Sequence, residues 1–442
     1  DQQHFLALAH GMVTWLTRGI HLGHYRQWFS VHIDDVLHPN DRWSTEANCT
    51  VGADCNPARD PAATPYNELI RMTGADAAYL DSWQRARGFK LDLAYNGAGS
   101  AEAIIEKGRD ELTDTLLARK AEYRWLNHTY GHEYLGCVKD YSVTPWRCKT
   151  DPLTGAIVYV SKTKIKDEIT RNVTWAANRG IALDRRELVT GEHSGLRALP
   201  QMTRDNPSFG PALTEAGVTV TGSDSSREPQ PRTVGSARTL PRYPMNIFYN
   251  VATAAEEVDE YNWIYTSRAN GGSGLCEHNP TTSTCIPPLD PATGFQSYIV
   301  PLETRIALRH VLSVDPRPHY AHQSNLAEER ILYPVVDQVL AAQRSLFAAS
   351  TPVVNPRTVD ASAALDAQVA WAANQRSITA YVSNGVVTVT NGGAATLVPV
   401  TLPNGTLTAA GTAFGQAYAG KRSSWVKVWQ SSTETFRLPA GA

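Results

Sequence analysis

The sequence lacks an excess of charge of either sign and lacks a long hydrophobic run. Its 442 residues include 41 lysines and arginines against 43 aspartates and glutamates, a formal net charge of -2. Such a chain has no general field that would attract nucleic acid or an anionic membrane surface. No apolar stretch approaches the roughly 18 to 20 residues that span a bilayer. We expect no nucleic-acid partner and no transmembrane segment; a neutral partner such as a sugar polymer fits better.

Cysteine is scarce, but the six cysteines are grouped. They form three close pairs, Cys49 and Cys55, Cys137 and Cys148, and Cys276 and Cys285. Six cysteines allow about 15 pairings, and the local grouping makes disulfides between nearest neighbours the simplest interpretation. A cysteine-ligated zinc site is the alternative, but no CxxC occurs and long intervals separate the pairs. Disulfides indicate an oxidising compartment, so we expect a secreted, extracellular or cell-wall-associated protein.

Glycosylation sequons agree with export from a eukaryotic cell, although such motifs are also common by chance. They begin at Asn48, Asn172 and Asn404, and a fourth, at Asn127, overlaps a histidine motif and is expected to be inaccessible. The chain begins at Asp1 rather than at a methionine, as expected of a mature or trimmed chain.

The order of predicted elements indicates an α/β fold with a mainly parallel sheet up to about residue 345. The candidate strands are residues 27–33, 89–95, 186–192, 218–223, 245–250 and 317–322. Residues 101–123 are expected to form one crossover helix with an apolar stripe of Ile104, Ile105, Leu112, Leu116 and Leu117. After a linker-like STPVVNPRT, β-rich runs alternate with Asn-Gly and Gly-Gly turn signals. We predict two domains, residues 1–348 and a β-sandwich-like accessory module, residues 349–442, that supplies no catalytic group.

Adjacent carboxylates follow the first predicted strand, in the segment VHIDDVL. Asp34 and Asp35 repel each other, so their proximity is costly unless a cation or a shared proton relieves it. A metal ion beside a general base would do so. The alternative is a solvated turn or a helix N-cap.

Two histidines stand four residues apart in WLNHTYGHEYL. One helical turn could direct His128 and His132 at a single ion, and with one carboxylate they would leave positions open for water and substrate. A chance pair is the alternative in a chain with 13 histidines. Thr129 replaces the glutamate of an HExxH motif, which disfavours a zincin protease.

A third polar segment, DPRPHYAHQSNL, closes the last predicted strand. His319 or His322 could donate a proton to a leaving amine, because the pKa of histidine lies near neutrality. An ordinary polar loop is the alternative. All three segments lie at the carboxyl ends of predicted strands, where barrels and open α/β sheets place their active sites.

Taken in order, the three segments resemble the motifs of the NodB-type polysaccharide deacetylases of carbohydrate esterase family four. The resemblance covers about residues 25–345 and implies a distorted (β/α) barrel that hydrolyses N-acetyl groups on a polysaccharide. It implies Asp34 as general base, Asp35, His128 and His132 as metal ligands, and His322 as a general acid that nearby carboxylates keep protonated. The implied cofactor is one divalent metal ion, zinc before cobalt or nickel.

The sequence departs from that family at three points. Val36 follows the Asp-Asp pair where the family has glycine, GEHSGL (191–196) replaces Arg-x-Pro-Tyr, and Asp-x-x-Asp-Trp is reduced to GSDSS. The pocket arginine and the partner of the histidine acid, which Asp224 would be, therefore stay unassigned. Candidates for substrate binding are Tyr130, His193, Asp224 and His319. Trp43, Tyr130 and Trp263 could stack on sugars, with a core or surface role as the alternative.

HIDDV, NHTYGHEYL, GEHSGL and PHYAHQSN are more similar still to a separate family of secreted fungal galactosaminogalactan deacetylases. That similarity implies acetate release from N-acetylgalactosamine residues of an exopolysaccharide of biofilms, and we expect a monomer. The alternatives are a deacetylase of chitin or peptidoglycan-type N-acetylglucosamine and an inactive carbohydrate-binding or adhesin protein. A glycoside hydrolase using Asp34 would lack a clear acid partner and would leave HTYGH unexplained.

Overall fold

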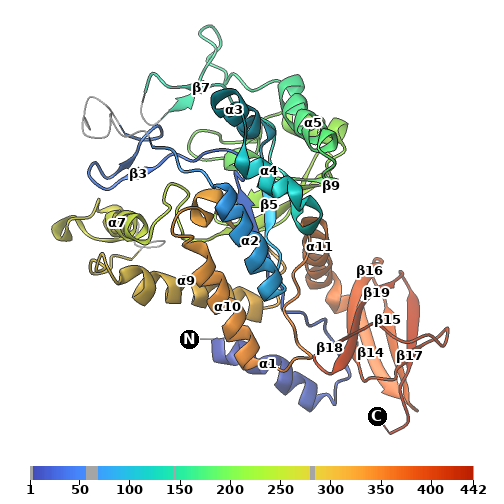
Figure 1. The fold of residues 1–442 in the computed structure, drawn as a ribbon. Coiled ribbons are helices and arrows are strands. Elements are labelled where there is room, and N and C mark those ends of the chain that lie inside the picture. The colour runs from blue at the N-terminus through green and yellow to red at the C-terminus, as the bar shows by residue number, and fades with distance from the viewer. Residues whose placement is uncertain (1–2, 56–67, 144–145, 279–283, 442) are drawn as a thin grey trace.

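The centre of the molecule is a closed barrel of parallel strands. The computed structural model describes residues 3–55, 68–143, 146–278 and 284–441. Seven strands pair in a ring in the order given, and the last pairs with the first: β2 (Val31–Asp34), β5 (Asp92–Tyr95), β6 (Arg124–Asn127), β9 (Leu183–Leu188), β10 (Val220–Asp224), β12 (Ala237–Pro244) and β13 (His319–His322). The expected distorted (β/α) barrel with a C-terminal all-β region is confirmed (Figure 1).

Helices surround the barrel and bury their apolar faces against it (Figure 1). They include α2 (Gly74–Arg87), α3 (Gly97–Lys107), α4 (Glu111–Ala118), α5 (Lys162–Asn178), α6 (Phe209–Ala216), α7 (Ala254–Tyr265), α9 (Val300–Leu312) and α10 (Leu332–Leu346). Local sequence sets several boundaries. Thr73 and Asp76 form a capping box at the start of α2, which ends at Gly88 in the left-handed region. No described helix has the length and apolar character needed to cross a membrane.

The sequence misplaced one strand and missed two. Residues 245–250 do not form the expected strand, and β12 lies just before them. Its sequence, ARTLPRYP, contains two prolines, two arginines and a threonine. It therefore lacks the alternation of apolar residues that predicts a strand. A strand was expected before the histidine motif, but β6 was not among the candidate ranges because its four residues run directly into that motif. The expected helix 101–123 was also wrong: the chain breaks at Gly108, and Ile104 and Ile105 are 42% and 85% exposed.

The C-terminal region contains two four-stranded sheets that share one apolar core (Figure 1). One has the order β1 (His21–Leu22), β16 (Thr396–Leu402), β19 (Lys421–Val428) and β18 (Gln416–Tyr418), and the other β14 (Ile378–Ser383), β15 (Val386–Asn391), β20 (Ser432–Arg437) and β17 (Leu407–Thr408). α11 (Thr358–Asn374) precedes them and packs Ala361 and Leu365 on the barrel residues Val220 and Leu240. The division at residues 348 and 349 stays a prediction.

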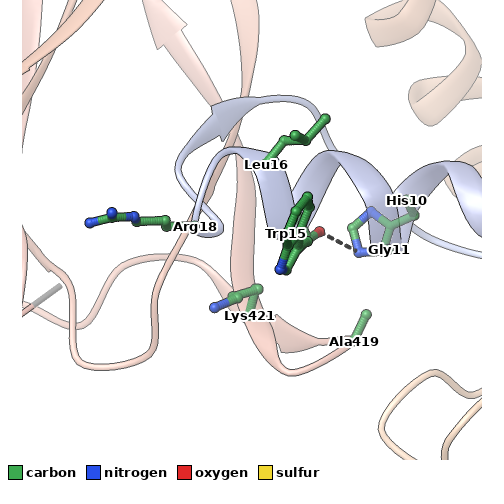
Figure 2. A pocket seen from close by; sticks show the side chains of 8 residues that line it. His10, Gly11, Trp15, Leu16, Arg18, Ala419 and Lys421 are labelled. Atoms are coloured by element: carbon green, nitrogen blue, oxygen red, sulfur yellow. Dashed lines mark hydrogen bonds between the residues drawn. The ribbon is translucent and has the colours of Figure 1, made fainter.

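The N-terminal helix α1 (Gln3–Leu16) lies against this region (Figure 1). A hollow of about 700 Å³ separates its last turns from the β18–β19 turn. Figure 2 shows Trp15, Arg18 and Lys421 around it, with Trp15 79% exposed. The chemistry-bearing motifs contribute none of the residues that line this hollow.

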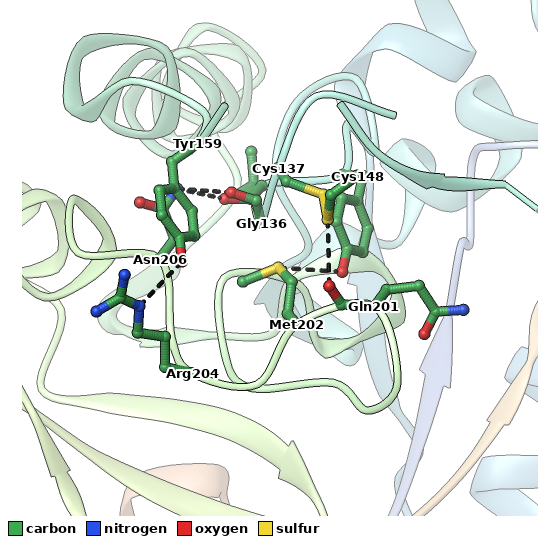
Figure 3. Close-up of a disulfide and its surroundings, with 10 residues drawn as sticks. Gly136, Cys137, Cys148, Tyr159, Gln201, Met202, Arg204 and Asn206 are labelled. Carbon is green, nitrogen blue, oxygen red and sulfur yellow. Dashed lines mark hydrogen bonds between the residues drawn. A yellow bond between two sulfur atoms is a disulfide. The ribbon is translucent and has the colours of Figure 1, made fainter. Parts of the chain in front are cut away.

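The three predicted disulfides are confirmed: Cys49–Cys55, Cys137–Cys148 and Cys276–Cys285. The second, shown in Figure 3, closes a loop immediately after the histidine motif. Two sequon asparagines, Asn127 and Asn172, are buried with their amides in hydrogen bonds. Asn127 is therefore inaccessible as expected, and Asn172 is inaccessible as well.

Candidate metal and acid–base site

The predicted chemical residues meet at the carboxyl end of the barrel. Asp34 is the last residue of β2, and Asp35 follows it with a φ of 63°. His128 is the first residue after β6. His322 ends β13 and is the register partner of Asp34 on the neighbouring strand. Adjacent strands lie about 4.8 Å apart, so the two residues face the same small volume.

Asp35, His128 and His132 bring ligand atoms to within 4.8 Å of one another. Oδ1 of Asp35 lies 3.1 Å from Nε2 of His128 and 3.0 Å from Nε2 of His132. Nδ1 of His128 lies 3.0 Å from the carbonyl oxygen of Val189. Because a carbonyl oxygen only accepts, Nδ1 donates to Val189, and Nε2 is the nitrogen that faces the carboxylate. One carboxylate and two imidazole nitrogens converging on one point are a donor set that fits a divalent metal ion.

The charges around this group agree with a cation site. Burial alone would lower the pKa of His132, but the charge of Asp35 and its hydrogen bond, together with the charges of Glu192 and Asp34, raise that pKa to about 9. Burial likewise would raise the pKa of Asp35, and the two histidines instead bring it well below its usual range. A proton on His132 thus supplies the positive charge that the carboxylate demands. A metal ion would supply the same charge to all three residues.

The histidine motif is a strained loop and not the helical turn that the spacing suggested. Thr129 and His132 have φ values of 65° and 55°, in the left-handed region that non-glycine residues rarely occupy. Buried asparagines hold this conformation. Nδ2 of Asn96 donates to the carbonyls of His128 and Thr129, and Oδ1 of Asn127 accepts from the Thr129 amide. Strain held in this way is typical of functional sites.

A second asparagine link supports the carboxylate. Nδ2 of Asn40 donates to Oδ2 of Asp35 at 2.8 Å, which leaves Oδ1 for the histidines. Oδ1 of Asn40 in turn accepts from Nε2 of Gln323 at 2.8 Å. These two hydrogen bonds connect the loop after β2 with the segment after His322. Such outer hydrogen bonds orient metal ligands.

The expected base, Asp34, is held by an arginine that the sequence did not reveal. Arg242 of β12 is fully buried, and its two terminal nitrogens donate to the two carboxylate oxygens of Asp34 at 2.9 and 2.8 Å. Nε of Arg242 also donates to Nε2 of His193 at 3.1 Å. Burial raises the pKa of Asp34, but the charge and hydrogen bonds of Arg242, together with the charges of His128 and His322, keep it below its usual range. Asp34 is therefore ionised, as a base has to be.

His193 occupies the segment that replaces the family's arginine motif. Its pKa lies well below the usual value because of burial and the charge of Arg242, so its imidazole is neutral. Glu192 and His193 both have positive φ, and a Cβ on Gly191 would lie 2.5 Å from the His132 ring. The segment 191–193 therefore contacts the metal group on one side and the Arg242–Asp34 pair on the other.

His322 lies in the site but differs from expectation in its charge and its partner. Burial lowers the pKa of His322 more than Asp34 and Asp35 raise it, so the imidazole is neutral and is not kept protonated. Its buried Nδ1 has no hydrogen-bond partner among the described residues. Asp224 is not that partner, because its carboxylate accepts from Ser226 and from the hydroxyl of Tyr320.

The structure does not bring the remaining candidates into contact with the ligand group. His319 is buried at the opposite end of β13, where its Nε2 lies 2.9 Å from Nδ1 of His310 and burial lowers its pKa to about 3. The Tyr130 ring is covered by the guanidinium of Arg171 at 3.9 Å. Trp43 is buried, with its indole N–H donating to Asp259. Trp263 is half-buried against the main core.

Comparison with known proteins supports the fold. Neither a family model nor a curated protein sequence matches the chain. Among solved structures the chain is similar to Agd3, a novel carbohydrate deacetylase, with a TM-score of 0.70 and 17% identity over 99% of this chain and 69% of that one. This similarity confirms, at the level of the fold, the resemblance that the motifs suggested.

Two more distant structures also match. A putative polysaccharide deacetylase from Mycobacterium smegmatis has a TM-score of 0.37 and 13% identity, covering 79% of this chain and 94% of that one. A family 4 carbohydrate esterase from Streptomyces lividans has a TM-score of 0.31 and 9% identity, covering 75% of this chain and 98% of that one.

Proposed function

We propose that this protein is a hydrolase that removes N-acetyl groups from an extracellular polysaccharide with the help of a divalent metal ion. The observation that carries the proposal is the convergence of Asp35, His128 and His132 within 4.8 Å, directly beside the ionised Asp34. A set of one carboxylate and two imidazoles leaves coordination positions for water and substrate. The similarity of fold to a carbohydrate deacetylase supports the same choice.

Asp34, Arg242 and His322 each have a different role in the proposed reaction. When bound, the divalent ion supplies Lewis-acid polarisation of the amide carbonyl and activation of water. Asp34 takes a proton from the attacking water, and Arg242 keeps the carboxylate ionised and oriented for that transfer. The C–N bond of the amide then breaks, and the sugar nitrogen needs a proton to leave as an amine. His322 is placed to deliver it, while acetate is the second product.

The neutral state of His322 adds one requirement to this scheme. A neutral imidazole is too weak an acid to protonate the leaving nitrogen, so His322 has to gain a second proton before the C–N bond breaks. Asp34 is its register partner across the β2–β13 pair and holds the proton taken from water. One proton passing from water through Asp34 and His322 to the nitrogen lets the amine leave, and the remaining proton of the acetic acid then moves to the amine, which gives acetate and an ammonium group.

The proposed substrate is N-acetylgalactosamine within a galactosaminogalactan-type polymer, and the proposed ion is zinc, with cobalt or nickel as substitutes. The similarity of four sequence segments to the galactosaminogalactan deacetylases supports the sugar. The three disulfides support a secreted protein acting outside the cell. A protein that only binds carbohydrate would have no need of an ionised base next to three converging ligands.

Acetate release from a panel of polymers tests the proposal. The panel contains partially acetylated galactosaminogalactan, chitin oligomers and peptidoglycan, each assayed with the holoprotein, with a chelator, and after zinc is restored. We expect acetate from the galactosamine polymer, loss of activity with the chelator, and recovery with zinc. Faster release from chitin or peptidoglycan would reassign the sugar. Absence of acetate from every polymer, with metal bound, would reject a deacetylase.

A further inference from the structure

A second hollow lies beside the metal group. Its volume is about 470 Å³, within the usual range of small-molecule pockets. We call it the tyrosine pocket, and the residues of its lining that matter here are Glu133, Tyr134, Lys139, Tyr141, Tyr159 and Lys164. Three aromatic rings next to lysine and glutamate heads are a surface that can take both the apolar face and the hydroxyl groups of a sugar.

The tyrosine pocket and the metal group share a wall. Glu133 directly follows the ligand His132, so their Cα atoms are about 3.8 Å apart. On the other side, Nζ of Lys139 pairs with Glu192 at 2.8 Å. Glu192 lies between Gly191, which approaches the His132 ring, and His193, which contacts Arg242. The lining of the pocket and the metal group thus belong to directly adjoining segments of the chain.

The charged side chains in and behind the pocket are already paired, two lysines with three glutamates. Lys164 pairs with Glu133 at 3.0 Å and with Glu168 at 3.3 Å, while Lys139 pairs with Glu192. Nζ of Lys139 also lies 4.8 Å from the centre of the Tyr134 ring. A pocket whose ammonium and carboxylate groups already have partners offers no free counter-ion to an anionic or a cationic ligand. It suits a neutral sugar, and an acetylated hexosamine is neutral whereas its deacetylated form carries an ammonium group.

The pocket is built on a rigid base. The Cys137–Cys148 disulfide closes the loop that carries Lys139 and Tyr141 (Figure 3). Nδ2 of Asn206 donates to the carbonyls of Leu135, Gly136 and Val160, which ties the two chain segments of the floor together. The hydroxyl of Tyr159 accepts from Nε of Arg204 (Figure 3). Walls fixed before binding reduce the ordering cost of a ligand.

One ring in the pocket is largely uncovered. Tyr141 is 75% exposed, whereas Tyr134 packs its edge on Trp146 and lies beneath Lys139. An exposed tyrosine ring has an apolar face and a polar hydroxyl, so it can stack on a sugar while staying hydrated at its edge. Tyr141 is thus the ring with most surface to offer a ligand.

We propose that the tyrosine pocket is a subsite that binds a neutral N-acetylated hexosamine unit next to the unit that loses its acetyl group. Tyr141 and Tyr159 form its aromatic walls. This inference rests on the proposed deacetylase function and deepens it, because it makes the enzyme select acetylated stretches of the polymer over stretches that are already deacetylated.

Substrate length separates the subsite from the chemistry. Acetate release is measured from N-acetylgalactosamine oligomers of one and six units with the zinc-loaded wild type, Tyr141→Ala and Tyr159→Ala. Tyr381→Ala is the matched control, because Tyr381 is 56% exposed on β14, in the C-terminal sheets. We expect kcat/KM on the six-unit oligomer to fall about tenfold in the two pocket variants, mainly through KM. Activity on the single sugar and in the control should stay unchanged.

Calorimetric binding of the same six-unit oligomer to an Asp34→Asn background distinguishes failure of the subsite from failure of the function. Weaker binding when Tyr141→Ala is added supports the subsite even if no acetate is ever released. Equal affinity with and without Tyr141→Ala, or an equal loss of activity on one- and six-unit substrates, overturns it. Equal affinity for fully deacetylated and fully acetylated oligomers would overturn the preference for a neutral sugar.

Discussion

Two groups of buried carboxylates lie near the carboxyl end of the barrel, and they are in opposite charge states. Asp34 and Asp35 follow β2, whereas Glu257 and Glu260 belong to α7 and Glu303 to α9. All five are 8% exposed or less, so burial does not distinguish them. The pKa values of the aspartates lie below their usual range, and those of the glutamates lie above it.

The partners explain the difference. Asp34 accepts two hydrogen bonds from Arg242, whereas Glu257 and Glu303 each accept one from a backbone amide, of Phe248 and Asn246 respectively. None of the glutamates forms a salt bridge within the described ranges. A buried carboxyl stays ionised when a cation faces it and takes up a proton when only a dipole does. The cationic partner, more than the acidic residue, therefore marks the carboxylates that can do chemistry here.

Substitution of a proposed metal ligand should have the largest effect, because it removes the cation that distinguishes the aspartate group from the glutamate group. Asp35→Ala, His128→Ala or His132→Ala each remove one of three protein ligands, so bound zinc should be lost on dialysis and turnover should fall by at least about a thousandfold. Metal content and acetate release are measured on the same samples. His278→Ala, at an exposed histidine on α8 (Leu275–His278), is the control and should change neither. A ligand variant that keeps one equivalent of zinc would contradict the assignment.

Neutralising the proton-transfer groups should leave the metal in place. Asp34→Asn keeps the shape of the side chain but removes its basicity, and His322→Ala removes the proposed acid. Each should retain zinc while slowing turnover by roughly a hundredfold or more, the usual worth of a positioned acid or base. Loss of zinc from His322→Ala, or wild-type turnover in either variant, would show that the roles are assigned wrongly.

One substitution separates the hydrogen-bonding geometry of Arg242 from its positive charge. Arg242→Lys keeps a cation but cannot form two parallel hydrogen bonds to Asp34 and one to His193. We expect zinc to be retained, turnover to fall by about tenfold to a hundredfold, and KM to change little. Arg238→Lys is the matched control, since Arg238 lies on the same strand and pairs with Asp366 of α11. Equal effects of the two substitutions would mean that Arg242 serves only the stability of β12.

The same contrast explains how far sequence reasoning reached. Asp34, Asp35, His128 and His132 could be singled out because their ligand types and their order along the chain form a pattern, and the structure brings the last three together. Arg242 was not found, because a partner from a distant strand leaves no local signal and its own strand contains Pro241 and Pro244. The charge state of His322 depends on how deeply the surrounding segments bury it. The spacing of residues along the sequence does not reveal that burial. The parallel barrel was predictable from strands that alternate with helices, but its register and short strands were not.

The glutamates should affect stability and leave the chemistry unchanged. Burial raises the pKa of Glu303 to about 7 and that of Glu260 to about 8, from usual values of 4.5. A carboxyl that binds its proton more tightly when folded stabilises the fold at low pH, and this stabilisation is lost as pH rises through the folded pKa. The Tm of the wild type should therefore fall between about pH 5 and pH 8. Glu303→Gln combined with Glu260→Gln keeps neutral side chains of the same shape, so the Tm should depend less on pH across that interval. Zinc content and turnover at pH 6 should stay at wild-type values. Thermal unfolding at several pH values measures this, with Glu277→Gln, an exposed glutamate of α8, as the control. If the double variant kept the wild-type slope, the two glutamates would be ionised in the folded protein, and burial without a facing cation would no longer separate them from Asp34 and Asp35.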